Sequence, residues 1–424
     1  MRVLVISRNA WDDTNAIGNT VSNFFNGIEG LEFANIYFRS AKPNNKVCGR
    51  YYRVTEGEVL KNWFSPRKNG RQFLWNEDNK AGNRTENEKN EKKLVRFIHK
   101  HNLGLAYKLS DYVWNSRKWI NGNLKQFIED FSPDIVFTFV KSAPQYYLTV
   151  RYLRETVGVP VLSWIADDEY TALSQKNDQK TIDKLRYILK ESAVVYGCSA
   201  EICEHYNSVF GCSAKPLYKG CDLSTPVKTV TGQPVKMVYA GNLLYGRLEI
   251  LRRIADMLED ASCGEGKATL EVYSNTLISA EDESFFAQKT HSKYMGQRDY
   301  EIIKQELASA DVVLHVESFE KEQLLKTKYS FSTKIIDCLQ SGSVLLAVGP
   351  EEQASMRYIR GIPGAFVMND PLRMKEDLMA FLGDASSFGK RAQRIREYAK
   401  KYHDAAVNAS GLEAVMKKIV EGDL

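Results

Sequence analysis

The sequence has no cysteine pair at the Cys-x-x-Cys spacing that zinc sites and thiol–disulfide motifs share. Its cysteines number seven, an odd count, and no histidine stands at a zinc-site offset from them. Cysteines in this arrangement are typical of reduced, mostly buried thiols in a cytosolic protein. The pattern excludes a disulfide-stapled scaffold, and no motif predicts a bound metal or another cofactor.

Long apolar runs are also missing. The N-terminal run covers only residues 3–6 before Arg8 and Asn9, which predicts a first strand rather than a secretion signal. No run approaches the length of about 20 apolar residues that a transmembrane helix needs. We therefore expect a cytoplasmic protein whose contact with a membrane is at most peripheral, at the inner face of the cytoplasmic membrane.

A strong excess of charge of either sign is absent as well. The formal net charge is +5 for 424 residues, which argues against wholesale binding of nucleic acid. Hydrophobic residues make up 43% and charged residues 26%, as in ordinary globular proteins. The length exceeds one compact core and predicts two domains.

Residues 329–350, YSFSTKIIDCLQSGSVLLAVGP, contain a complete loop, helix and strand. Gly342 ends the predicted helix, and the apolar run 344–348 is typical of a parallel strand that is covered on both faces. The hydroxyl residues Ser330, Ser332 and Thr333 are suited to cap the helix.

The first turn of this helix carries the residues that indicate a ligand. Lys334 beside a helix N-terminus forms a ready site for phosphate, and Asp337, one turn further, can accept hydrogen bonds from a ribose. The alternative is an ordinary loop–helix–strand unit of an α/β protein.

This stretch resembles the donor-site helix of GT-B glycosyltransferases, especially the retaining family four, in the branch found in bacterial capsule, O-antigen and exopolysaccharide clusters. The resemblance places Asp337 at the second of the two paired glutamates of that family, the one that holds the donor ribose. The first glutamate, which sits against the transferred sugar, is replaced by Tyr329.

The start of the chain predicts a strand over residues 2–7, the loop RNAWDDTNAIGNT and a helix from about Val21. This is the first unit of a doubly wound domain, with its loop at the carboxyl end of the sheet. The resemblance implies that Gly18, Asn19 and Thr20 approach the donor phosphates and the acceptor. A turn-forming role for Gly18 is the alternative.

Residues 48–126 are the least regular part and predict a basic helical insertion. The charged segment 79–102 suggests a loop and a basic helix, and residues 107–131 have the pattern of an amphipathic helix with Leu109, Val113, Trp114, Trp119 and Ile120 as apolar members. These features suggest an interfacial patch near anionic lipid, where a lipid-linked acceptor is presented. The alternative is a solvated helical face.

Two acids follow the predicted strand 159–166. Asp167 and Asp168 stand at its carboxyl end, where they can orient the acceptor hydroxyl or take its proton. Capping of the next helix is the alternative for Asp168, and the sequence does not rank the two acids.

The second domain begins with the strand 235–241. The resemblance places Gly241 in the phosphate loop, Asn242 at the family's arginine and Arg247 close to its lysine. Arg247 as a surface residue at a helix start is the alternative.

The resemblance implies two sets of site residues. The predicted catalytic residues are Asp167, Asp168, Arg247 and Lys334. The predicted donor-binding residues, of which Gly296–Arg298 lie near the nucleobase, are Gly18, Asn19, Gly241, Asn242, Arg247, Ser274, Gly296, Gln297, Arg298, Ser332, Thr333, Lys334 and Asp337.

Strands alternate with helices throughout, which predicts an α/β protein. The resemblance implies a GT-B fold, with two Rossmann-like, doubly wound domains facing a cleft. We place the N-terminal, acceptor-side domain at residues 1–225, a linker at 226–234, the nucleotide-sugar domain at 235–395 and C-terminal helices that cross back at 396–424.

The predicted function is transfer of a sugar from a nucleotide diphosphate-sugar, most simply a UDP-sugar, to a saccharide acceptor, and the resemblance implies transfer with retention of configuration. The acceptor is expected to be lipid-linked and to belong to cell-surface polysaccharide synthesis, and transfer is expected to be independent of metal. Three alternatives remain open: a nucleotide-sugar epimerase, a non-catalytic relative that assists a transferase, and an inverting enzyme with Asp167 or Asp168 as general base.

Overall fold

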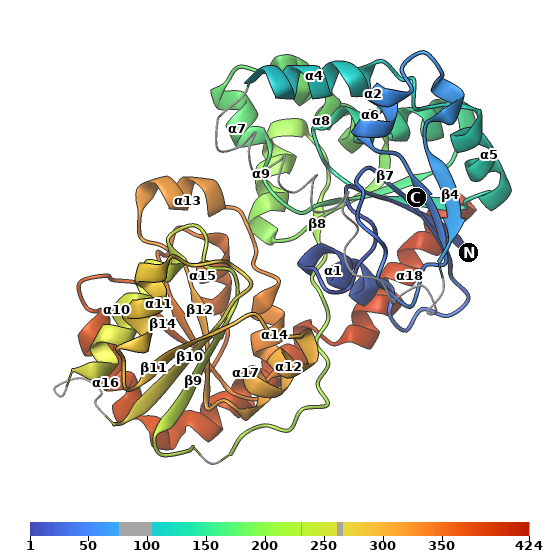
Figure 1. The fold of residues 1–424 in the computed structure, drawn as a ribbon. Helices are drawn as coiled ribbons and strands as arrows, with labels where there is room; N and C mark the ends of the chain where they lie inside the picture. Colours follow the sequence, from blue (N-terminus) through green and yellow to red (C-terminus); the bar gives the residue numbers. More distant parts are fainter. Residues whose placement is uncertain (76–103, 230, 261–265, 424) are drawn as a thin grey trace. The chain divides into compact units, whose positions relative to one another are not determined.

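A computed structural model describes residues 1–75, 104–229, 231–260 and 266–423. The chain divides into two compact units. The N-terminal unit comprises Met1–Leu217 with Ala409–Leu424, and the C-terminal unit comprises Tyr218–Asn408. Each unit is built around its own largely parallel sheet (Figure 1).

The N-terminal sheet has the order β4-β3-β2-β1-β5-β6-β7-β8, and all neighbours are parallel except β3 and β4. Its central strands are buried on both faces, as their continuous apolar runs predict. The strands are β1 Arg2–Ser7, β2 Glu32–Tyr37, β3 Arg50–Arg53, β4 Arg71–Leu74, β5 Ile135–Phe139, β6 Val161–Ile165, β7 Ser192–Gly197 and β8 Lys215–Pro216.

Helices cover both faces of this sheet (Figure 1). They are α1 Ala16–Phe25, α2 Glu56–Lys61, α4 Gly104–Asn115, α5 Gly122–Phe131, α6 Pro144–Tyr152, α7 Tyr170–Gln175, α8 Gln179–Glu191 and α9 Ala200–Phe210, with one π-helical turn at Leu153–Val157 and a 3-10 turn at Pro66–Lys68. Helix α18, Ala405–Glu421, contains the boundary at which the chain returns to the N-terminal unit.

The C-terminal sheet is entirely parallel, in the order β11-β10-β9-β12-β13-β14. Its strands are β9 Val235–Ala240, β10 Ala268–Tyr273, β11 Ser292–Gly296, β12 Val312–Val316, β13 Val344–Val348 and β14 Phe366–Met368. The strand order reverses between β9 and β12, which is the switch point of a doubly wound sheet and the usual place for a ligand.

Helices α10, α11 and α16 cover one face of this sheet, and α12, α14 and α17 cover the other (Figure 1). The helices of this unit are α10 Arg247–Glu259, α11 Ala280–Ala287, α12 Tyr300–Ser309, α13 Lys321–Thr327, α14 Lys334–Gln340, α15 Ala354–Arg360, α16 Met374–Gly383 and α17 Phe388–Tyr402, with a 3-10 turn at Ala385–Ser387. The strand predicted at 344–348 and the helix before it are confirmed.

The unit boundaries differ from the predicted ones because the segment after Leu217 is bonded into the C-terminal unit. The Cys221 N–H donates to His403 O at 2.6 Å, and the Asp222 N–H donates to Gln340 Oε1 at 3.1 Å. Arg396 also donates to Leu223 O at 2.6 Å, so α17 remains with the C-terminal unit.

Two predicted elements change. The helix expected from about Val21 begins at Ala16, because the Asn15 side chain caps it by accepting from Gly18 N–H. The single helix expected over 107–131 is two helices, since Arg117 has a left-handed φ of 57° and Asn121 caps α5. The basic segment predicted at 79–102 lies wholly within residues 76–103, which are outside the described residues.

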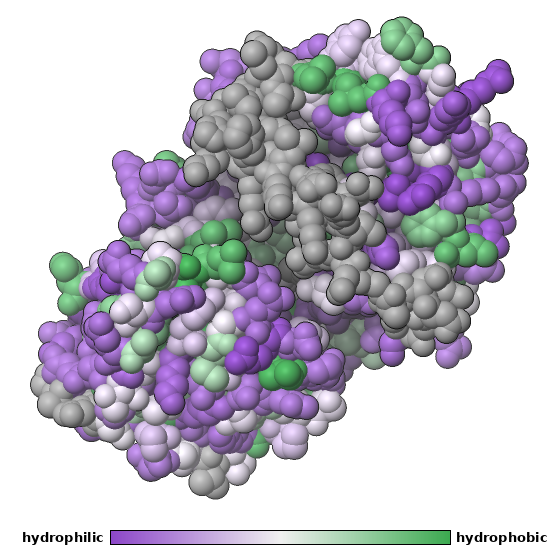
Figure 2. All heavy atoms as spheres, viewed as in Figure 1, coloured by the Kyte–Doolittle hydropathy of each residue, from purple (hydrophilic) through white to green (hydrophobic). Residues whose placement is uncertain are grey.

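On the face seen in Figure 2, the apolar side chains of the described residues form small patches among hydrophilic ones. Val113, Trp114 and Trp119, three of the residues predicted to face a lipid surface, are buried in the N-terminal unit. None of the described helices combines the length and apolar character needed to cross a bilayer.

Candidate functional site

The candidate site of the C-terminal unit lies at the carboxyl ends of β9 and β12. The loop after β9 carries Gly241 and Asn242 and leads into α10, whose first residue is Arg247. Glu317 follows β12 directly, and the Glu317 N–H donates to Val348 O at 2.8 Å at the end of β13. Three neighbouring strands therefore deliver their loops to one place.

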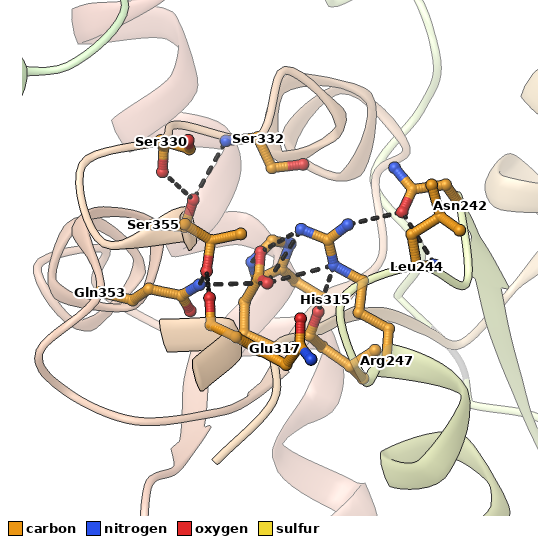
Figure 3. Close-up of polar contacts among 12 residues, drawn as sticks. Asn242, Leu244, Arg247, His315, Glu317, Ser330, Ser332, Gln353 and Ser355 are labelled. Carbon is orange, nitrogen blue, oxygen red and sulfur yellow. Dashed lines mark hydrogen bonds and ion pairs between the residues drawn. The ribbon is translucent and has the colours of Figure 1, made fainter. Parts of the chain in front are cut away.

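Arg247 and Glu317 form a buried bidentate ion pair (Figure 3). Arg247 Nη2 lies 2.9 Å from both carboxylate oxygens of Glu317, and Nε lies 3.1 Å from Oε2. Nε also donates to Val316 O at 3.2 Å, and Nη1 donates to Asn242 Oδ1 at 2.6 Å. The side chains are 11% and 3% exposed, so the pair is fixed and carries no net charge.

The pair is strengthened by its surroundings. Burial alone would raise the pKa of Glu317, but His315 and Arg247 together lower it to about 2. His315 Nε2 lies 3.3 Å from Glu317 Oε1, and Gln353 Nε2 donates to Glu317 Oε2 at 3.2 Å. Burial likewise opposes the charge of Arg247, but Glu317 raises the pKa of its guanidinium. Both partners are therefore charged.

Lys334 differs from Arg247 in having no acidic partner. No hydrogen bond or ion pair joins its ammonium to any residue within the described ranges. Burial and the positive charge of Arg247 lower the pKa of Lys334, and the nearby acids Asp337 and Glu317 offset this lowering only in part. Lys334 is therefore the cation of this site whose charge is left for a ligand.

Gly241 provides room for the Lys334 side chain. A Cβ atom at residue 241 would lie 3.1 Å from Lys334 Cδ and 2.6 Å from the Tyr239 hydroxyl oxygen. The Gly241 N–H donates to Tyr273 O at 3.0 Å, which holds the loop to the end of β10. A larger residue at position 241 would collide with Tyr239 and crowd Lys334, which explains the glycine.

The loop before α14 is held by contacts that the sequence did not predict. The Ser332 N–H donates to Ser355 Oγ at 3.0 Å, and that hydroxyl donates to Ser330 O at 3.1 Å (Figure 3). Thr333 occupies the N-cap position of α14 but forms no side-chain capping bond, so the predicted hydroxyl cap is wrong. Helix α14 has only seven residues, and attraction of an anion therefore rests mainly on Lys334.

Asp337 is held at one of its two oxygens. Oδ1 accepts from Lys219 Nζ at 2.8 Å and from the Tyr300 hydroxyl at 3.3 Å, while Oδ2 has no hydrogen bond in the part of the chain that the structure describes. Burial disfavours the charge of Lys219, but Asp337 raises the pKa of this lysine. The carboxylate is oriented by two neighbours and keeps one oxygen for a hydroxyl donor.

The remaining predicted donor residues lie at the ends of β10 and β11. The Ser274 N–H donates to Gly296 O at 3.0 Å, and the Ser274 hydroxyl accepts from Thr276 N–H at 3.0 Å. Arg298 Nη1 donates to Gln297 O at 2.9 Å. Ser274 and Gly296 are thus joined at the carboxyl ends of β10 and β11, and β10 is in turn the neighbour of β9.

Gly18 and Asn19 occupy a helix rather than the predicted loop. The Gly18 N–H donates to Asn15 Oδ1 at 2.8 Å, and the Asn19 N–H donates to Asn15 O at 3.0 Å, so both N–H groups are used within the helix start. A Cβ atom at residue 18 would lie 2.0 Å from Asp12 O. Close approach of backbone explains this glycine.

Asp167 and Asp168 follow β6 in the N-terminal unit, as predicted, but have different surroundings. Asp167 is 61% exposed and its Oδ2 lies 2.9 Å from Lys141 Nζ. Asp168 is 12% exposed; its Oδ1 accepts from Thr171 N–H at 3.2 Å and lies 3.9 Å from His205 Nε2. Asp168 therefore accepts a hydrogen bond from the first turn of α7, whose N-cap position is held by Glu169, and Asp167 is the more exposed of the two acids.

Lys141 connects the acids of this turn. Its Nζ lies 3.1 Å from Glu169 Oε1 as well as 2.9 Å from Asp167. Burial would lower the pKa of Lys141, but Asp167 and Glu169 raise it. A cavity of about 200 Å³ beside β1 and β5 is lined by Lys141, Asp167 and Gly18, among others. The structure thus brings two of the predicted residues of this unit to one cavity.

Sequence reasoning missed Glu317, Lys219, Lys141 and Gln353. Glu317 carried a usable signal, since it directly follows the apolar run VVLHV at the carboxyl end of a strand. The pairing of Lys219 with Asp337 spans 118 residues and has no local signal. Within the described ranges, no group of three or more His, Cys, Asp or Glu side chains is placed to hold a metal ion.

Comparison with known proteins identifies the fold. No protein-family description and no curated protein sequence matches the chain. Among solved structures, Anabaena HepE in complex with UDP is 12% identical, with a TM-score of 0.62 and coverage of 99% of this chain and 100% of that chain. The trehalose-6-phosphate synthase OtsA is 10% identical, with a TM-score of 0.62 and coverage of 99% of both chains.

WaaG, described as a glycosyltransferase involved in lipopolysaccharide biosynthesis, is 10% identical, with a TM-score of 0.59 and coverage of 98% of this chain and 99% of that chain. At such identities the similarity establishes architecture and not activity. The similarity to these structures over nearly the whole chain, together with two Rossmann-like units, shows that this protein has the GT-B fold.

Proposed function

We propose that the protein is a glycosyltransferase that moves a sugar from a nucleotide diphosphate-sugar to a saccharide acceptor. The proposal rests on the donor-type site of the C-terminal unit, and chiefly on Lys334, a partly buried cation without a counterion at the switch point of a doubly wound sheet. HepE, which shares the fold, has been solved with UDP and with UDP-glucose, which favours a UDP-sugar as donor.

In the proposed reaction, the bond between the anomeric carbon and the diphosphate oxygen breaks, and the acceptor hydroxyl oxygen bonds to that carbon. Lys334 stabilises the negative charge that develops on the leaving diphosphate, which is electrostatic catalysis by a preorganised group. Asp337 Oδ2 accepts a ribose hydroxyl. No metal ion or cofactor is assigned a role.

Arg247 takes a different part from the one expected of a free phosphate ligand. Its donors are directed to Glu317, Val316 O and Asn242, so we assign it to shaping the loop 241–246 beside Lys334. The hydroxyl proton of the acceptor passes to the departing phosphate in a retaining transfer, or to Asp167 in an inverting one. We propose retention, in keeping with the family resemblance.

For the acceptor we propose a lipid-linked saccharide of cell-surface polysaccharide synthesis, reached from the cytoplasmic side of the membrane. The description of WaaG, which shares the fold, supports this choice. Flotation with vesicles of anionic and of zwitterionic lipid tests the membrane contact. Equal recovery of protein with both kinds of vesicle, or none with either, contradicts it.

Nucleotide binding tests the proposal most directly. Thermal unfolding is followed with UDP, GDP, ADP, CMP and dTDP and their sugar conjugates, and we expect stabilisation by UDP and UDP-sugars that grows with concentration. Lys334→Ala removes a charge-assisted contact worth about 1.5–3 kcal/mol and is expected to weaken UDP binding by about ten- to a hundredfold. Lys375→Ala is the matched control, because Lys375 pairs with Asp260 on the surface.

The product distinguishes the alternatives. Sugar appearing on an acceptor supports transfer, and an isomerised donor without acceptor indicates an epimerase. Nucleotide binding without either product indicates a non-catalytic relative, a reading favoured by Tyr329 at the place of the family's first glutamate. Absence of a shift with all nucleotides contradicts the proposed donor site.

A further inference from the structure

A second cavity lies within the N-terminal unit. It has a volume of about 580 Å³, inside the range of roughly 300–1,000 Å³ that is usual for small-molecule sites. Residues of α2, α4, α6, α7 and α8 line it, together with the segments that follow β1, β2, β5 and β6. The proposed reaction assigns no role to the residues that line this cavity but not the smaller cavity at Asp167.

Gln145 indicates that the cavity is built for a polar ligand. This residue of α6 lines the cavity and is only 9% exposed, yet its Oε1 has no hydrogen-bond partner. A buried amide oxygen without a partner costs free energy unless a ligand or water donates to it. Gln145 therefore provides an amide oxygen that has no hydrogen-bond partner among the described residues of the cavity wall.

Glu56 supplies a second hydrogen-bond acceptor that lines this cavity. Its Oε2 accepts from the Ser110 hydroxyl at 2.6 Å and from Trp114 Nε1–H at 3.1 Å. Its Oε1 has no hydrogen bond within the described residues, and Glu56, Ser110 and Trp114 all line the cavity. The Glu56 carboxylate is thus held in one orientation, and its Oε1 can accept a hydrogen bond from a ligand. Oδ2 of Asp337 has the same property in the C-terminal unit.

The charge of the lining indicates which ligands fit. Acidic and basic side chains occur in nearly equal number around the cavity, and Lys141 is already paired with Asp167 and Glu169. A phosphate or carboxylate would meet the carboxylates of Glu56 and Asp168, which also line the cavity. A neutral molecule rich in hydroxyl groups can donate to the acids and to Gln145 without such repulsion.

We propose that this cavity binds neutral sugar residues of the acceptor that do not themselves react. It adjoins the smaller cavity at Asp167, since Arg8, Lys141 and Tyr146 line both. The reacting residue occupies the smaller cavity and the preceding residues occupy the larger one. The acceptor is then a neutral oligosaccharide rather than a monosaccharide. This inference rests on the proposed function.

Binding of neutral glycans to the full-length protein tests the inference. An array of neutral and acidic mono- and oligosaccharides identifies a ligand, whose affinity is then measured by titration calorimetry. We expect neutral oligosaccharides to bind and the corresponding monosaccharides to bind at least about tenfold more weakly, because the latter lose the contacts of the larger cavity.

Two variants locate the site. Glu56→Gln and Gln145→Leu are each expected to weaken oligosaccharide binding by about tenfold while leaving UDP affinity unchanged. Gln126→Leu is the matched control for Gln145→Leu, since Gln126 is an exposed residue of α5. Thermal unfolding checks each variant, and Glu56→Gln preserves the shape of the side chain should Gln145→Leu not fold.

The outcomes separate this inference from the proposed function. Two outcomes overturn the inference and leave the donor site in place. In the first, the protein binds UDP but no neutral oligosaccharide. In the second, both variants bind the oligosaccharide as tightly as the wild-type protein does. Preference for acidic glycans also overturns it. If the wild-type protein does not bind UDP, this result contradicts the proposed function instead.

Discussion

Each unit has a lysine near the carboxyl ends of its central strands, but the two units balance the charge of this lysine differently. In the N-terminal unit, Lys141 follows β5, the neighbour of the first strand, and it is paired with Asp167 and Glu169. In the C-terminal unit, the acid Glu317 follows the corresponding strand β12 and is used by Arg247, which leaves Lys334 without a partner.

Under the proposed function, the sheet topology gives each unit a place for a ligand, and the pairing of the charges there selects the kind of ligand. A paired lysine between two carboxylates offers hydrogen-bond acceptors and little net charge, which suits hydroxyl groups. An unpaired lysine beside a neutral ion pair offers one positive charge, which suits a phosphate. The predictions below change one partner at a time to test that contrast.

The largest effect is expected for Glu317→Ala. Loss of this acid leaves the buried Arg247 without a counterion, which is expected to cost about 3–5 kcal/mol of unfolding free energy. Denaturant unfolding measures the loss. The control Glu322→Ala removes an exposed pair with Lys326 and is expected to change stability by about 0.5 kcal/mol or less. A loss below about 1 kcal/mol for Glu317→Ala would show that the pair is not fixed as described.

Lys141→Ala comes next. It leaves Asp167 and the partly buried Glu169 without their cation, with an expected cost of about 1–3 kcal/mol. UDP affinity is expected to remain at the wild-type value while acceptor binding weakens. Calorimetric titrations with UDP and with acceptor measure the two separately. An equal loss in both titrations would contradict the assignment of the two lysines to different ligands.

Lys219→Ala is expected to have a moderate effect on the donor site. Asp337 loses the partner at Oδ1 that orients it, so affinity for uridine and UDP should fall by a similar factor of about three to ten. Lys219→Arg is expected to recover most of the loss. If Lys219→Ala weakens UDP but not uridine, the lysine contacts phosphate rather than orienting the ribose acceptor.

The smallest effect concerns the protonation of Lys334. Since its pKa is lowered in the folded protein, UDP affinity should decline with rising pH before an ordinary lysine would titrate near pH 10.4. The charged form is disfavoured by folding, so Lys334→Met should raise the melting temperature at neutral pH. This gain should shrink as the pH rises above the folded pKa and vanish near the ordinary lysine value of about 10.4. Titrations and melting curves over about pH 7–10 check both signs. A lower melting temperature for the variant contradicts the unpaired state.

Much of the fold was accessible from local patterns. The runs Arg2–Ser7 and Val344–Val348 predicted buried strands because both faces of a parallel strand need apolar side chains. The start of α1 was missed although Asn15 is a good capping residue, since the polar loop around it offered several similar candidates. The helix break before Asn121 was missed for the same reason.

The site was accessible only in part. Lys334 and Asp337 share one helix turn with a recognisable pattern, so the sequence alone indicated them. The partners Glu317 and Lys219 lie 70 and 118 residues from the side chains that they bind. Such pairings depend on tertiary structure, and the role of Arg247 changed because its counterion could not be known.

The buried pair also has a consequence for ionic strength. Salt screens exposed charges over a Debye length of about 8 Å at physiological concentration, whereas a pair that excludes solvent is screened much less. The loop held by Arg247 and Glu317 should therefore keep its shape in concentrated salt, while the attraction of Lys334 for a nucleotide declines. A salt-rich buffer should thus empty the donor site and leave its architecture intact.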